Sequence, residues 1–257
     1  MSDLNAHGVL AAVELAFYAP AFLISVAICI KQGFSRNAGW FYMVLISVFR
    51  LIGASCVLYM ETQHDYSAGL QETAAITSAV GTAPLLLALL EFLQRVNGSM
   101  TSKGPTAKIF RPIHLVSLVA LILAIVGGVQ SSQGNSGDYS TGRSLMKAGS
   151  VLFLLVWLAL AAIAVLTCTR RCYTPDSESK LVLTSVCVLP FLLVRVIYTV
   201  AVSFSTPGSI FAYPIPNVVV QAIMMFAMEA LALCFYMWAV MSTSKQERSA
   251  NIDGSKD

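Results

Sequence analysis

The chain has 257 residues, of which 57% are hydrophobic and only 11% are charged. Soluble domains average about 45–50% apolar and about 25% charged residues, so this chain has too little charge to cover a water-exposed surface. The apolar residues come in blocks of about 20 or more, the length that crosses a hydrocarbon layer about 30 Å thick. The composition therefore excludes a soluble globular protein and predicts an integral membrane protein.

Seven apolar segments predict seven transmembrane helices in one domain over residues 1–241. In chain order the expected spans are Val9–Ile30, Ala38–Met60, Glu72–Leu93, Ile113–Val129, Ala148–Thr167, Leu181–Phe204 and Asn217–Met241. Residues 1–8 lack the Lys or Arg of a secretory signal sequence, so we expect the first segment to be a true span. The polar residues 242–257 predict a disordered tail. The predicted fold class is an all-α membrane bundle of seven helices.

The distribution of Lys and Arg predicts how the bundle is oriented. Twelve basic residues flank one membrane face, namely Lys31, Arg36, Arg95, Lys103, Lys108, Arg111, Arg170, Arg171, Lys180, Lys245, Arg248 and Lys256. The opposite face has only Arg143 and Lys147. Because cytosolic loops carry the excess of basic residues, we expect a lumenal or outside N-terminus and a cytosolic C-terminus.

Several ionisable side chains lie inside the expected spans. They are Glu14, Arg50, Glu72, Glu91, Arg195 and Glu229. A charge at the bilayer centre costs about 2.5–3.5 kcal/mol, so such residues normally pair, face the bundle interior or line a wet cavity. Glu91 is near the cytosolic end of its span, and Arg95 follows one helical turn later, which predicts an interfacial ion pair. The other five are expected between the midplane and the lumenal face.

These five residues and two tyrosines predict one polar pocket that opens toward the lumenal face. The set comprises the predicted catalytic acids Glu14, Glu72 and Glu229, and the predicted substrate-binding or acid-tuning residues Arg50, Arg195, Tyr18 and Tyr198. Tyr18 follows Glu14 by four residues, so both point the same way from a helix. The alternative is a pair of buried ion pairs that only fix the order of the helices. Three acids, two arginines and two tyrosines exceed what such pairing needs.

Missing motifs narrow the chemistry of the pocket. The sequence has no nucleotide-binding glycine pattern, no HExxH, no GxSxG and no Asp-rich diphosphate motif. The three histidines are scattered, which argues against a conventional metal centre. We therefore expect no metal, no cofactor and no nucleic-acid partner. The groups that remain are carboxyls, tyrosines and apolar walls within the lipid bilayer.

Such a pocket suits acid catalysis on an apolar molecule. A carboxylic acid in an apolar site keeps its proton and can give it to an epoxide oxygen or an alkene. A nearby arginine can hold a second carboxylate ionised, ready to act as a base. An acid and a base kept apart in this way are what a protonation-initiated cyclisation needs.

Three short runs carry a family resemblance: ELAFYAP at Glu14–Pro20, FRLIGAS at Phe49–Ser55 and PFLLVRVIY at Pro190–Tyr198. In these runs the chain resembles a fungal family of seven-span proteins, near the small membrane-bound terpene cyclases of the ascochlorin, ascofuranone and macrophorin pathways. The resemblance implies an isomerase or lyase of meroterpenoid secondary metabolism in the endoplasmic reticulum membrane. Such an enzyme protonates the terminal epoxide or olefin of a farnesylated aromatic or quinone polyketide and cyclises its prenyl chain. It would use no metal and would work beside other enzymes of its pathway.

A small-molecule transporter or a receptor-like protein is the alternative from a different class. An outside N-terminus and a cytosolic tail form the topology of a receptor, and a carrier would also use buried Glu and Arg. Against a receptor, no DRY-type triplet follows the third span and no NPxxY lies in the seventh. Against a carrier, the sequence shows no internal repeat.

Overall fold

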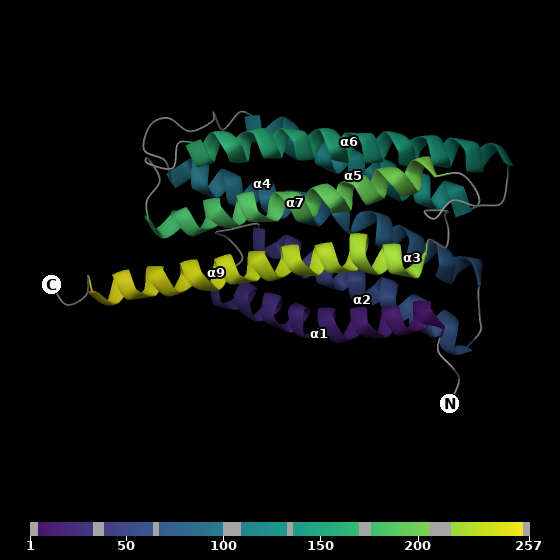
Figure 1. Ribbon diagram of the computed structural model, residues 1–257, viewed down its shortest axis with the longest axis horizontal. Coiled ribbons are helices and arrows are strands. Elements are labelled where there is room, and N and C mark those ends of the chain that lie inside the picture. Colours follow the sequence, from purple (N-terminus) through teal and green to yellow (C-terminus); the bar gives the residue numbers. More distant parts are fainter. Residues whose placement is uncertain are drawn as a thin grey trace.

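The computed structural model describes residues 5–32, 39–63, 67–99, 109–132, 136–169, 176–205 and 217–253. Every regular element within these residues is a helix, and seven helical segments are long and apolar enough to cross a membrane. The predicted all-α bundle of seven helices is therefore confirmed. The helices lie side by side along one long axis, with the two termini at opposite ends (Figure 1). Which end is cytosolic stays a prediction.

The elements in chain order are α1 (Ala6–Gln32), α2 (Gly39–Gln63), α3 (Ala68–Val80), α4 (Thr82–Ser99), α5 (Phe110–Ser132), α6 (Ser136–Thr169), α7 (Asp176–Phe204), α8 (Val218–Val220), the π-helix η3 (Gln221–Ala227) and α9 (Met228–Asp253). In Figure 1, α1 and α2 form one edge of the bundle and α5 and α6 the opposite edge. Helix α4 lies in the interior, where it contacts α2, α5, α6, α7 and α9. Residues 83–90 of α4 are all buried, so this apolar run is core and not lipid-facing surface.

The third span is divided at Gly81 into α3 and α4, where the sequence predicts one helix over Glu72–Leu93. Pro84 has no backbone N–H and cannot donate to the carbonyl of Val80, which weakens the helix at this point. A Cβ atom at Gly81 would lie 3.1 Å from Arg50 Nη2. The glycine therefore lets the Arg50 guanidinium lie against the backbone of the break.

The seventh span begins irregularly. Asn217 caps it by accepting a hydrogen bond from the backbone N–H of Val219 at 3.0 Å. The π-helix η3 then precedes α9, and Glu229 lies in the first turn of α9. Single π turns inside helices are rare, and those that occur are often located at functional sites. The wider turn sets the direction in which Glu229 leaves the helix.

Helix α9 continues beyond the seventh span to Asp253, whereas the sequence predicts a disordered tail over residues 242–257. Residues 242–253 contain no glycine or proline, and their Lys, Gln, Glu and Arg residues favour a helix. Polarity ends the membrane span but does not by itself end the helix. Residues 254–257 lie outside the described residues.

Helices α5 and α6 approach each other closely through glycines. A Cβ atom at Gly127 would lie 2.8 Å from the carbonyl oxygen of Gly142. A Cβ atom at Gly142 would lie 2.6 Å from the backbone nitrogen of Ser131. Small residues of this kind allow two membrane helices to pack backbone against backbone. This helix pair forms a tightly packed edge of the bundle.

Candidate functional site

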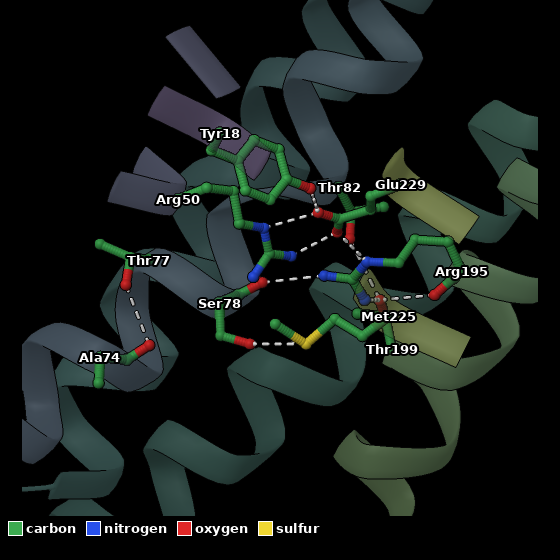
Figure 2. Close-up of polar contacts among 10 residues, drawn as sticks. All are labelled: Tyr18, Arg50, Ala74, Thr77, Ser78, Thr82, Arg195, Thr199, Met225 and Glu229. Carbon is green, nitrogen blue, oxygen red and sulfur yellow. Dashed lines mark hydrogen bonds and ion pairs between the residues drawn. The ribbon is translucent and has the colours of Figure 1, made fainter. Parts of the chain in front are cut away.

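Glu229 is the centre of a buried polar network that includes Tyr18, Arg50 and Arg195 (Figure 2). Its carboxylate is 0% exposed. Arg50 of α2 donates from Nε to Oε2 at 2.6 Å and from Nη2 to Oε1 at 2.5 Å. Arg195 of α7 donates from Nε to the same Oε1, and the Tyr18 hydroxyl of α1 donates to Oε2 at 3.4 Å. Both oxygens of Glu229 are therefore engaged by protein donors.

All three nitrogens of Arg195 also donate within the protein. Besides the bond from Nε to Glu229, Nη1 donates to Thr199 Oγ1 at 2.8 Å and Nη2 donates to the Ser78 carbonyl at 2.9 Å. The hydroxyls of Thr82 and Thr199 are 3.2 Å apart. Arg195 is only 2% exposed, so water cannot accept hydrogen bonds from its guanidinium. These protein oxygens are the acceptors instead. The guanidinium fixes α7 against α3 and α9.

Arg50 differs from Arg195 in having an unused donor. Its Nε and Nη2 both donate to Glu229, whereas Nη1 has no acceptor among the described residues. Arg50 is 4% exposed and lines a cavity. One nitrogen of this buried guanidinium is therefore without an acceptor among the described residues.

Glu14 is the second acid near the two arginines, and its carboxyl differs from that of Glu229 in its hydrogen bonding. Its side chain is 6% exposed and lines the same cavity. Its Oε1 atom is buried and has no hydrogen-bond partner among the described residues. An unpaired buried polar atom costs roughly 1–3 kcal/mol, so its position calls for an explanation. A bound ligand that pairs with the carboxyl would supply one.

The cavity has a volume of about 210 Å³ and lies between α1, α2, α3, α6, α7 and η3. Its inner end, as we call it, is formed by Glu14, Arg50, Ser78, Arg195, Tyr198 and Thr199. Its outer end, at the helix termini on the N-terminal side of the bundle, is formed by His7, Glu61, Gln71 and Gln221. The walls between include Leu10, Ala11, Ala54, Val57, Ala74, Met146, Val202 and Met225. The cavity is polar at both ends and apolar between them.

The structure brings together six of the seven residues that the sequence singles out. Tyr18, Arg50, Arg195 and Glu229 form the network, while Glu14 and Tyr198 join the two arginines at the inner end. The ring of Tyr198 lies 5.6 Å from the Arg195 guanidinium carbon. Four of the seven, namely Glu14, Arg50, Arg195 and Tyr198, line the cavity, and its outer end lies on the N-terminal side of the bundle.

Glu72 is the exception, because it neither lines the cavity nor contacts the network within the described residues. On α3, Gln71 and Ala74 face the cavity. Successive residues of a helix are turned by about 100°, so Glu72 leaves α3 in another direction and is half-buried there. The prediction grouped Glu72 with the other acids because of its expected depth in the membrane. In the structure, its position around the α3 axis directs it away from them.

The cavity also contains residues that the sequence reasoning missed. His7 and Glu61 lie just beyond the expected ends of the first two spans. The spacing of these residues in the sequence could have identified them. His7 precedes Glu14 by 7 residues, and Glu61 follows Arg50 by 11. Those spacings are about two and three helical turns, which keep each pair on one face. The Ser78 carbonyl gives no such signal, since any residue could supply it.

Residues 4–246 match the family described as "Domain of unknown function (DUF7702)", and the chain belongs to that family. The match extends over all seven membrane-length helices. A search of curated proteins gives no match. The family assigns no activity, so the functional argument depends on the site.

Proposed function

We propose that this protein is a membrane-bound, metal-independent terpene cyclase of fungal meroterpenoid biosynthesis. It would protonate the terminal epoxide or olefin of a farnesylated aromatic or quinone polyketide and cyclise the prenyl chain. The observation that carries the proposal is the Glu14 carboxyl, which is unpaired at the inner end of a cavity with apolar walls. A carboxylic acid in such a site is suited to donate a proton to an apolar molecule.

The contacts of the two acids support different roles for them. Both oxygens of Glu229 accept hydrogen bonds from arginines, and Glu229 is not among the residues that line the cavity. Glu229 is therefore a positioning residue that holds Arg50 and Arg195 in the cavity wall. Glu14 is the proposed catalytic acid, because it is the carboxyl that a ligand can reach at the inner end.

The dimensions of the cavity support an elongated, largely apolar ligand. Glu14 and His7 are separated by about 10 Å along α1, and Arg50 and Glu61 by about 16 Å along α2, at 1.5 Å per residue. The walls between these ends are mainly aliphatic and include two methionines. A prenyl chain buries its surface against such walls, with its terminus at Glu14 and its polar head group at the outer end.

The proposed reaction begins with transfer of the Glu14 proton to the epoxide oxygen. The C–O bond breaks, the oxygen becomes a hydroxyl, and the carbocation is attacked by the next double bond of the chain. The last carbocation loses a proton from carbon, and Glu14 regains a proton, so the net change is an isomerisation. The unused Nη1 donor of Arg50 favours an epoxide over an olefin, because only the epoxide has an oxygen to accept its hydrogen bond.

The cellular setting is part of the same proposal. The seven apolar helices support a multi-pass integral membrane protein. We place it in the endoplasmic reticulum, with the N-terminus lumenal and the C-terminus cytosolic, as the basic residues predict. An apolar farnesylated substrate partitions into the bilayer, and other enzymes of its pathway would make it there.

The test is expression of the full chain in a host supplied with a farnesylated phenol, with and without its terminal epoxide. A cyclic product with the mass of the substrate is expected from wild type. Glu14→Gln should lower its formation by about 100-fold or more while the protein still accumulates in membranes, because general acids contribute about 10²–10⁴-fold. Glu72→Gln is the matched control and should keep wild-type turnover. The proposal fails if wild type cyclises neither substrate, and Glu14 is the wrong acid if its variant stays active.

A further inference from the structure

The outer end of the cavity has no role in the proton transfer described above. Glu61 of α2 and His7 of α1 lie there, both half-buried. Neither side chain makes a hydrogen bond or an ion pair with another described residue. A cavity of this membrane bundle therefore has a second group of polar atoms available to a ligand, separate from the inner end.

We infer that the outer end is a subsite for a hydroxylated aromatic head group, with Glu61 as the acceptor of a phenolic O–H. This inference rests on the proposed function, since it assumes a ligand whose far terminus meets Glu14. Glu61 lies three turns along the same face of α2 as Arg50. One elongated ligand can therefore contact the inner end with its terminus and Glu61 with its head group.

The chemistry of Glu61 narrows the substrate class. An ionised carboxylate has only acceptor atoms, so it pairs with a group that donates. A phenol donates its O–H, and hydrogen bonds to a charged acceptor are among the stronger ones in proteins. A quinone carbonyl has no proton to give and would face the carboxylate with another acceptor. Of the two head groups in the proposed substrate class, the site therefore favours the phenol.

His7 fits the same subsite as an adaptable partner. A neutral imidazole offers one donor and one acceptor nitrogen, so it can pair with a second hydroxyl or with a carbonyl on the ring. It lies two helical turns from Glu14 on the same face of α1, as Glu61 lies three turns from Arg50 on α2. Two helices thus each present a polar residue at both ends of the cavity.

The experiment compares a farnesylated phenol epoxide with its O-methyl ether in wild type, Glu61→Ala and Glu72→Ala. Wild type is expected to prefer the phenol by about 10- to 100-fold in kcat/KM, the value of a hydrogen bond to a charged group. Glu61→Ala should raise KM for the phenol with little change in kcat, because the bond is made equally in the ground and transition states. Turnover of the ether by the same variant shows that the protein is folded. Glu72→Ala should keep the wild-type preference.

The outcomes separate the two proposals. Equal kcat/KM for phenol and ether in wild type would overturn the head-group subsite and leave the cyclase standing. A phenol preference that survives Glu61→Ala would equally exclude Glu61 as the acceptor. Absence of any cyclic product from either compound would overturn the cyclase, and the subsite with it.

Discussion

Replacing Glu229 with glutamine tests the network that shapes the inner end of the cavity. The change keeps the size of the side chain and removes its charge. In the folded protein, Arg50 and Arg195 are 4% and 2% exposed, and each donates directly to the Glu229 carboxylate. The glutamine amide would place an NH₂ group against guanidinium donors on one side. Two buried cations would then share a single neutral acceptor oxygen.

The expected loss of stability follows from the number of contacts. Removing one partner of a buried ion pair typically costs about 3–5 kcal/mol, because the other charge is left buried and unpaired. Here one carboxylate serves two arginines, so the upper end of about 5 kcal/mol is expected. At about 2–4 °C per kcal/mol for a chain of 150–250 residues, this amounts to a fall of about 10 to 20 °C in Tm.

The assay is the fraction of detergent-solubilised protein that stays monodisperse on size exclusion after heating. Glu72→Gln is the control, since it makes the same change at a half-buried acid outside the network, and it should shift Tm by only a few degrees. A double variant, Glu229→Gln with Arg50→Met, should recover part of the loss, because one stranded cation is removed. An unchanged Tm for Glu229→Gln would refute the role of the carboxylate as the anchor of both arginines.

Two further predictions concern packing and the network. Gly142→Ala should lower stability by about 1–3 kcal/mol or more, because its Cβ would lie 2.6 Å from the Ser131 backbone nitrogen. Gly128→Ala is the control and should be tolerated, because the atom nearest to its Cβ would be 3.5 Å away. Equal Tm values for these two alanine variants would contradict the close approach of α5 and α6. Tyr18→Phe should cost only about 1 kcal/mol, since its hydroxyl is 3.4 Å from Glu229 and two arginines remain. A loss as large as that of Glu229→Gln would show that Tyr18 is a main support of the carboxylate.

Part of the candidate site could be predicted from the sequence. Charges are costly in a bilayer, so the presence of Arg50, Arg195 and Glu229 within apolar segments already predicted that they meet. The spacing of these residues along the chain could not predict which hydrogen-bond partner each of them has. Glu14 and Glu229 look alike in the sequence, yet one is saturated by donors and the other has an unpaired oxygen. That difference depends on contacts between helices far apart in the chain.

The sequence alone determined the class, the seven spans and the presence of ionisable residues inside them, because crossing a bilayer requires apolar stretches of about 20 residues. The seven-span prediction did not include the break at Gly81 or the π turn before Glu229. The sequence also did not determine which side of α3 faces the cavity, and so it grouped Glu72 with the acids of the site. Only the packed bundle decided that Glu14, and not Glu229, has an unpaired oxygen. The reason is physical: membrane depth follows from position in the chain, whereas hydrogen-bond pairing follows from rotation and contact of the helices.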